Sequence, residues 1–296
     1  MTRKTAADFH PEVLKLFDLF VHGLLDRRGF LDGAKRFATG GAGAAALLEA
    51  LSPRFAEAEQ VAKEDPRIKA KTIEAPSPEG NGVVKGYFVE PANRTATLPT
   101  ILVIHENRGL NPHIEDIARR LALANFVVFA PDALAPLGGY PGDEDKAREL
   151  FQKLDQTKAR NDFIAALGVL KKSSIGTGKV GAVGFCYGGG VVNFLATKSA
   201  DLDAGVPFYG AAPPIEDVAR IKAPLLLNFA GVDDRINATW PPYEAALKAA
   251  KADYQAYVYP GVQHGFNNDT TPRYDEAAAK LAWGRTIDFF NARLRG

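Results

Sequence analysis

The only cysteine of the chain, Cys186, lies in the run Gly184-Phe185-Cys186-Tyr187-Gly188. A nucleophilic side chain between two such glycines is typical of the sharp turn from a buried strand into a helix, where the glycines let the backbones approach closely. The N-terminus of the following helix favours a negative charge and therefore favours thiolate over thiol. No serine of the chain has the same pair of flanking glycines. We therefore expect Cys186 to be a nucleophile and not an inert buried cysteine.

A nucleophile at such a turn requires a histidine as general base and an acid that orients it, in the chain order nucleophile, acid, histidine. His264 follows the last apolar run of strand length, and two adjacent aspartates, Asp233 and Asp234, follow an earlier one. Counting from Gly231 selects Asp234. Counting back from Ile236, whose apolar side chain would anchor the loop, selects Asp233. We expect Asp233 to be the acid and His264 to be the base.

The turn His105-Glu106-Asn107-Arg108-Gly109 follows the first long apolar strand pattern, where the second half of an oxyanion hole is expected. The backbone N–H groups of Asn107 and Tyr187 would then bind the oxygen of a tetrahedral intermediate. A carboxylate at Glu106, pointing at the thiol, would raise the pKa of the thiol. His105 and Glu106 are not continued into the H-E-x-x-H zinc motif. We expect no metal and no cofactor.

Together these motifs resemble those of the dienelactone hydrolase family. The resemblance covers roughly residues 68–296 and rests on four segments: 184–189, the Glu106 turn, Ala130-Pro131-Asp132, and Gly261-Val262-Gln263-His264-Gly265-Phe266. It implies an enzyme like carboxymethylenebutenolidase, which cleaves a lactone or carboxylic ester through a cysteine acyl-enzyme. The implied triad is Cys186, Asp233 and His264. The resemblance also implies that Glu106 holds the resting thiol until substrate arrives.

The resemblance is interrupted at the arginines that bind the substrate carboxylate in that family. The matching places are about Pro136 and Asn268, and neither side chain can form a bidentate pair with a carboxylate. Arg108, Arg235 or Arg273 could replace them, and Arg108 is our candidate for substrate binding. The physiological substrate stays open.

Two alternatives to a lactone hydrolase are kept. The first is a thiol-dependent esterase or acyltransferase for apolar acyl groups, favoured by the missing arginines. The second is a non-catalytic protein that uses the hydrolase fold for binding, since fold alone does not determine function.

From about residue 68 onward, apolar runs of strand length alternate with helix-patterned segments. This pattern predicts an α/β-hydrolase fold with a mainly parallel central sheet and helices on both faces. The first two strands, 67–75 and 83–90, are expected to form an antiparallel hairpin. The other strands are expected at 100–105, 126–131, 179–185, 204–209, 224–230 and 254–259, and helices at 114–124, 143–171, 188–198, 242–251 and 272–293.

The N-terminal residues precede this pattern, and we divide the chain into an extension, residues 1–66, and a catalytic domain, residues 67–296. The spacing of Phe9, Val13, Leu16, Phe17 and Phe20 indicates a helical arm packed on the body or on a second subunit. An arm of this kind could make the protein a homo-oligomer. Because every catalytic motif lies after residue 100, we expect deletion of residues 1–60 to leave the chemistry intact.

The same extension has features of a twin-arginine export signal. The run Arg27-Arg28-Gly29-Phe30-Leu31 precedes a weakly apolar stretch, residues 37–51, and then Ala56-Glu57-Ala58. This interpretation predicts a periplasmic protein, whereas a structural arm predicts a cytoplasmic one. Both interpretations stay open.

Composition limits the classes of partner. The 36 basic and 35 acidic residues leave a formal net charge of +1, which gives no general attraction for nucleic acid or an anionic membrane. One cysteine excludes an intrachain disulfide and any cysteine-rich metal site. No uninterrupted apolar run reaches the roughly 18 residues of a membrane span. We expect a small-molecule ester or lactone as the partner.

Overall fold

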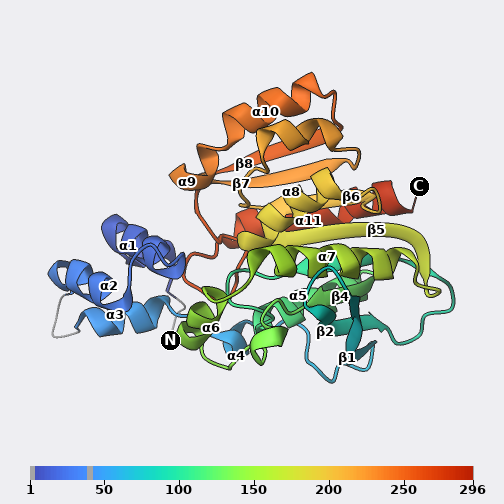
Figure 1. Cartoon of the computed structure of the whole chain (residues 1–296). Coiled ribbons are helices and arrows are strands. Elements are labelled where there is room, and N and C mark those ends of the chain that lie inside the picture. The colour runs from blue at the N-terminus through green and yellow to red at the C-terminus, as the bar shows by residue number, and fades with distance from the viewer. Residues whose placement is uncertain (1–3, 39–42, 296) are drawn as a thin grey trace.

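The computed structural model describes residues 4–38 and 43–295. Within these residues eight strands form one sheet in the order β1-β2-β4-β3-β5-β6-β7-β8 (Figure 1). The strands are β1 (Ile68–Ser77), β2 (Gly82–Pro91), β3 (Leu98–Ile104), β4 (Val127–Pro131), β5 (Gly176–Phe185), β6 (Ala204–Phe208), β7 (Leu225–Val232) and β8 (Tyr254–Gln263). The pairs from β4 through β8 are parallel, whereas β1 and β2 are antiparallel to their neighbours. The predicted mainly parallel sheet and opening hairpin are confirmed.

Seven helices of the described chain follow β3 in sequence: α5 (Pro112–Leu123), α6 (Glu144–Phe151), α7 (Gln156–Lys171), α8 (Tyr187–Lys198), α9 (Asp234–Asn237), α10 (Trp240–Ala249) and α11 (Glu276–Leu294). The predicted single helix at 143–171 is wrong. The Asp155 side chain accepts hydrogen bonds from the N–H groups of Thr157 and Lys158 and so caps a new helix, α7. Asp275 caps α11 in the same way, which begins that helix at Glu276 and not at 272.

Helices cover both faces of the sheet, as a mainly parallel sheet requires. One apolar core packs α5 and α11 against one face, and a second packs α7, α8 and α10 against the other. The inner strands are buried almost without interruption. Figure 1 shows these layers with the sheet between them. This arrangement brings the carboxyl ends of the parallel strands to one edge, where ligands bind in open α/β sheets.

The N-terminal arm consists of α1 (Pro11–Val21), α2 (Arg27–Ala34), α3 (Ala44–Leu51) and α4 (Phe55–Ala58), with short 3-10 turns at Ala6–Asp8 and Lys35–Phe37. The amphipathic spacing is confirmed, because Val13, Phe17 and Phe20 are buried in an apolar cluster that belongs to the arm itself. In Figure 1 these blue helices lie beside α6 and the loop that leaves β8. None of the described helices is long and apolar enough to span a bilayer.

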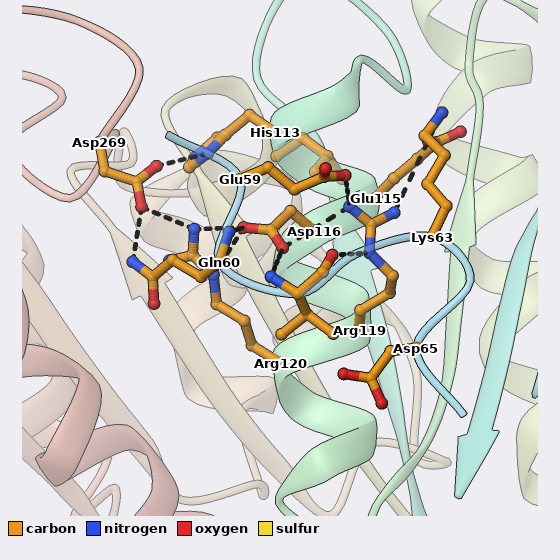
Figure 2. A network of polar contacts seen from close by, with 12 residues as sticks. Glu59, Gln60, Lys63, Asp65, His113, Glu115, Asp116, Arg119, Arg120 and Asp269 are labelled. Atoms are coloured by element: carbon orange, nitrogen blue, oxygen red, sulfur yellow. Dashed lines mark hydrogen bonds and ion pairs between the residues drawn. The ribbon is translucent and has the colours of Figure 1, made fainter. Parts of the chain in front are cut away.

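A network of polar contacts fixes the end of the arm to the body (Figure 2). The buried carboxylate of Asp116, on α5, accepts hydrogen bonds from the backbone N–H groups of Gln60 and Val61, at 3.2 and 2.9 Å. Arg119 donates to the Val61 carbonyl at 2.7 Å. The Gln60 side chain donates to Asp269, in the loop after β8, at 2.8 Å. We call these five residues the clamp. They join the arm, α5 and the loop after β8.

Candidate active site

Cys186 occupies a strained turn between β5 and α8. Its backbone has φ 55° and ψ −113°, a combination that side-chain-bearing residues rarely adopt and that costs about 1–3 kcal/mol. A Cβ added to Gly184 would lie 2.1 Å from the Gly188 carbonyl oxygen, and one added to Gly188 would lie 2.2 Å from the Ile104 carbonyl oxygen. Both glycines are therefore required by close backbone contact. The turn has the shape that the G-x-C-x-G motif predicts.

His264 follows β8, and its Nδ1 lies 2.6 Å from Oδ2 of Asp233, just after β7. Both side chains are buried, whereas Asp234 is exposed. The other oxygen of Asp233 accepts a hydrogen bond from the N–H of Ile236 at 3.4 Å, and Ile236 is itself buried. The apolar anchor expected at Ile236 is thus present. Of the two aspartates, the structure pairs Asp233 with the histidine.

The imidazole of His264 lies near the thiol of Cys186. Nδ1 of His264 is taken by Asp233, and its Nε2 is buried without a hydrogen-bond partner among the described residues. The candidate ligand atoms of Cys186 and His264 lie within 4.8 Å of each other. Burial alone would raise the pKa of Cys186, but His264 and a second imidazole lower it to about 6. Burial would lower the pKa of His264, but Cys186 and Asp233 raise it. Both shifts favour the thiolate–imidazolium form of the two groups over the neutral form.

The second imidazole belongs to His22, at the C-terminal end of α1. Its Nε2 lies 3.4 Å from Sγ of Cys186 and 3.0 Å from Nη2 of Arg235. Its Nδ1 lies 2.7 Å from the backbone oxygen of Asp18 and 3.3 Å from the carboxylate of Asp18. A residue of the N-terminal arm therefore lies at the predicted nucleophile, although every sequence motif of the site follows residue 100. No local sequence motif marks His22, since it lies 164 positions before the cysteine.

The residues expected to form the oxyanion hole, Asn107 and Tyr187, line one cavity together with Cys186. Tyr187 begins α8, so its N–H is one of the helix-terminal donors without an intrahelical partner. Asn107 lies in the turn after β3 and lines the same cavity as Tyr187 and Cys186. The side-chain amide of Asn107 also donates to the Val21 carbonyl at 2.7 Å. The turn thus contacts the arm as well as the nucleophile.

Two cavities, of about 410 and 310 Å³, meet at the thiol. Among the described residues they share three wall residues, His22, Asn107 and Cys186. The larger cavity is lined by aromatic residues of the arm and by charged groups that include Glu106 and Arg108. The smaller cavity is largely apolar, with Tyr187, Val191, Phe194, Pro213 and Pro214 in its wall. Cys186 therefore lies in the wall of both cavities, between the larger and the smaller one.

Residues 84–294, which contain this site, match the family model described as "Dienelactone hydrolase family". The chain belongs to the dienelactone hydrolase family. Residues 1–40 match a second family model, described as "YqhI-like". The helices α1 and α2, including His22, lie outside the part matched by the hydrolase model.

Relatives and solved structures agree with this family. A protein of Methylorubrum extorquens described as "Putative carboxymethylenebutenolidase" is 31% identical over 72% of this chain and 78% of its own length. The "Putative hydrolase fragment YghX" of Escherichia coli is 53% identical over 38% of this chain and 97% of its own length. The crystal structure of a "Putative Dienelactone Hydrolase" from Klebsiella pneumoniae has a TM-score of 0.65, 27% identity, and covers 75% of this chain and 98% of that one. This chain is a dienelactone hydrolase-like hydrolase with the α/β-hydrolase fold.

This chain has an asparagine, Asn268, at one of the positions where the family resemblance would place an arginine. Asn268 donates from Nδ2 to Oε2 of Glu106 at 2.8 Å, and both line the larger cavity. Arg108 is buried in the same wall, with Nε 3.6 Å from Glu144. Arg273 lines this cavity too and lies 3.5 Å from Asp18. Arg235 lines the smaller cavity instead.

The contacts of His105 indicate a structural role for this residue. It is fully buried, its Nδ1 lies 2.5 Å from the Glu106 carbonyl, and its Nε2 accepts from the Ala133 N–H at 3.0 Å. Burial lowers its pKa, so the ring is neutral. Both ring nitrogens are occupied by backbone groups, which leaves neither for catalysis.

Proposed function

We propose that this hydrolase cleaves a carboxylic ester or lactone through a cysteine acyl-enzyme. The observation that carries the proposal is the strained Cys186 turn beside the His264–Asp233 pair, in a chain of the dienelactone hydrolase family. The lowered thiol pKa supports it, because the thiolate is the nucleophilic form. In this role Asp233 fixes the ring of His264 with Nδ1–H toward the carboxylate.

The first half of the reaction forms a thioester. The Cys186 sulfur attacks the carbonyl carbon, and the N–H groups of Asn107 and Tyr187 bind the resulting oxyanion. The tetrahedral intermediate then collapses, the carbon–oxygen bond breaks, and the His264 imidazolium gives its proton to the leaving alkoxide. In a lactone the leaving alcohol stays attached through the acyl chain.

The second half hydrolyses the thioester. Neutral His264 takes a proton from water, and the hydroxide oxygen attacks the thioester carbon. The carbon–sulfur bond breaks and Cys186 leaves as thiolate, while His264 retains the proton. The acid is released and the ion pair is restored. No group outside the protein and the substrate is consumed except water.

In this proposal Glu106 acts on the resting thiol, and Arg108 acts on the substrate. Glu106 lines the cavity that contains Cys186 and is held by Asn268, so its charge disfavours a second negative charge on the sulfur. Arg108 supplies a buried cation in the same wall, where a polar or anionic part of the substrate would contact it.

A second candidate is a thiol-dependent esterase or acyltransferase for apolar acyl groups. The apolar part of the smaller cavity favours it, because Val191, Phe194 and Pro213 would pack against an apolar acyl chain. An alcohol added as acceptor distinguishes transfer from hydrolysis. The hydrolase gives only free acid, whereas a transferase gives the new ester in proportion to the alcohol.

The test is turnover of chromogenic esters of increasing acyl length, and of a lactone, by the full chain and by Cys186→Ala. We expect the variant to retain less than a few per cent of the activity, since the structure holds no other thiol. Stoichiometric iodoacetamide labelling of Cys186 should abolish turnover in parallel. Comparable activity in the variant would remove Cys186 from the mechanism. An unreactive thiol with no turnover would instead favour a binding protein.

A further inference from the structure

The N-terminal arm brings a second carboxylate–imidazole pair to the nucleophile. Asp233 and His264 approach Cys186 from the hydrolase body, and Asp18 and His22 approach it from α1. The rings of the two histidines are 4.7 Å apart, at an interplanar angle of 82°. We propose that the arm is a permanent wall of the active site and that His22 is a catalytic residue that holds the Cys186 sulfur as thiolate. The proposal rests on the proposed function only in taking Cys186 as the reactive group.

The geometry of His22 fits this role. Its Nε2 is 3.4 Å from the sulfur, within the range of a hydrogen bond to sulfur, and its Nδ1 is held by Asp18. Burial would lower the pKa of His22, but Cys186 and Asp18 raise it. An opposite charge at this distance stabilises a thiolate. In this proposal the His22 ring stabilises the Cys186 thiolate from the arm, as the His264 ring does from the hydrolase body.

Other charged groups surround His22 and Cys186 and affect the protonation of both. They are Asp18 from α1, Asp233 from the end of β7, Arg235 from α9, Glu106 and Arg108 from the turn after β3, and Arg273 after β8. Arg235 lies 3.0 Å from the same nitrogen of His22 that faces the sulfur. A neutral His22 accepts a hydrogen bond from Arg235, whereas a protonated His22 donates to the thiolate. In the second state the exposed side chain of Arg235 must leave Nε2 of His22, because two donors cannot share one hydrogen bond.

Several contacts hold α1 in place. Asn107 and Arg148 of the body donate to the carbonyls of Val21 and Phe20, at 2.7 and 3.2 Å. Arg148 also lies over the Phe20 ring, 4.0 Å from its centroid. The clamp fixes the other end of the arm (Figure 2). Because the arm is held at both ends, His22 is part of the resting site.

The position of His22 also explains the two cavities. It is one of the three residues common to both, so its ring stands where the larger, charged cavity meets the smaller, apolar one. The acyl part and the leaving part of an ester attach to the same carbonyl carbon, which must lie against Cys186. In this proposal His22 would lie beside the reacting centre, between the two parts of the ester.

The experiment measures the rate of iodoacetamide alkylation of Cys186 against pH in the full chain, with His22→Gln, Asp18→Asn and, as the matched control, His10→Gln. His10 is exposed on the same arm and its ring stacks on Phe37. We expect His22→Gln to raise the midpoint pH by about one unit or more, which lowers the rate at pH 6 by about fivefold. Asp18→Asn should shift the midpoint in the same direction by less, and His10→Gln should not shift it.

A midpoint within about 0.3 pH units of the parent chain for His22→Gln, or a downward shift, would overturn the proposal. Thermal unfolding of each variant shows whether it is folded. If His22→Gln does not fold, Asp18→Asn decides, because it keeps the imidazole and removes only the charge behind it. Ester turnover separates the two proposals. A shifted midpoint in a chain without turnover supports the thiolate role of His22 and defeats the hydrolase mechanism, whereas turnover with an unshifted midpoint does the reverse.

Discussion

At the scale of single residues, the chemistry depends on which carboxylate orients which imidazole. Asp233 is 2.6 Å from Nδ1 of His264, while Asp234 is exposed beside it. We expect Asp233→Asn to lower kcat by about 10²-fold or more, since the amide permits the wrong ring tautomer. Asp234→Asn should change kcat by less than about tenfold. Ester hydrolysis by variants of matched thermal stability measures both, and the reverse ranking would make Asp234 the triad acid.

The pH dependence of the thiol follows from the same residues. The pKa of Cys186 is lowered to about 6 by His264 and His22 against the effect of burial. Because the thiolate is the reactive form, alkylation should be fast at pH 7 to 8 and should fall as the pH drops through about 6. The measurement is a rate–pH profile with iodoacetamide. A midpoint near that of a free thiol, about 8.5, would mean that the imidazoles do not stabilise the thiolate.

Glu106 acts in the opposite sense. Its carboxylate lines the cavity of Cys186, and a nearby negative charge disfavours a thiolate. We expect Glu106→Gln to shift the alkylation profile to lower pH while thermal unfolding stays within a few degrees of the parent. Asn268→Ala is the companion variant, because it frees Glu106 without removing its charge. An unchanged profile in Glu106→Gln would show that Glu106 does not act on the thiol.

The residue types that sequence could predict are those with local motifs. Cys186 was marked by its glycines, and His264 and Asp233 by the strands before them. His22 was not predictable, because nothing in its own segment refers to a thiol 164 positions away. Only packing of the arm brings it there.

At the scale of elements, the junction of β5 and α8 is the least tolerant part of the fold. A Cβ on Gly188 would meet backbone oxygens of the β3 end at 2.2 and 2.7 Å, whereas one on Gly190 would meet nothing closer than 3.7 Å. We expect Gly188→Ala to lower the unfolding free energy by about 2 kcal/mol or more, or to prevent folding, and to abolish activity. Gly190→Ala, in the same helix, should be nearly neutral. Thermal unfolding of the pair tests this, and equal stability would show that the turn can relax.

The elements were largely predictable, since alternating apolar runs located every strand of the described sheet to within a few residues. The error at 143–171 has a physical reason. The apolar periodicity continues between α6 and α7, although the chain is not helical there. The Asp155 side chain accepts hydrogen bonds from backbone N–H groups and so caps the start of α7.

At the scale of the whole molecule, the clamp makes the arm and the hydrolase body one structure. Asp116 is buried, and it contacts Arg119 and Arg120 as well as two N–H groups of the arm. We expect Asp116→Ala to destabilise the protein by about 3–5 kcal/mol, because two arginines lose a buried partner. Asp65→Asn, which weakens an ion pair with the exposed Arg67, is the control and should have a smaller effect.

Thermal unfolding and limited proteolysis of the arm measure this difference. Faster cleavage before residue 59 in Asp116→Ala, but not in Asp65→Asn, would accompany the loss of stability. Equal resistance in both variants would mean that the clamp does not hold the arm. The assembly of the arm on its own body could not be predicted from sequence, because the spacing of Val13, Phe17 and Phe20 shows an apolar face without showing what covers it.

The position of His22 before α4 means that a cut at the end of the arm would remove His22 from the site. Ala58 is the last residue of α4, and Glu59 and Gln60, which Figure 2 labels, follow it directly. Val61, whose N–H donates to Asp116, comes next. A signal peptidase that cut after Ala58 would leave these three residues on the body and remove His22 with everything before it. The mature product would then have one imidazole on its thiol and a site open to solvent on the arm side. Such a cut would therefore change the reactivity of Cys186, whereas an arm that stays attached keeps both imidazoles at the thiol.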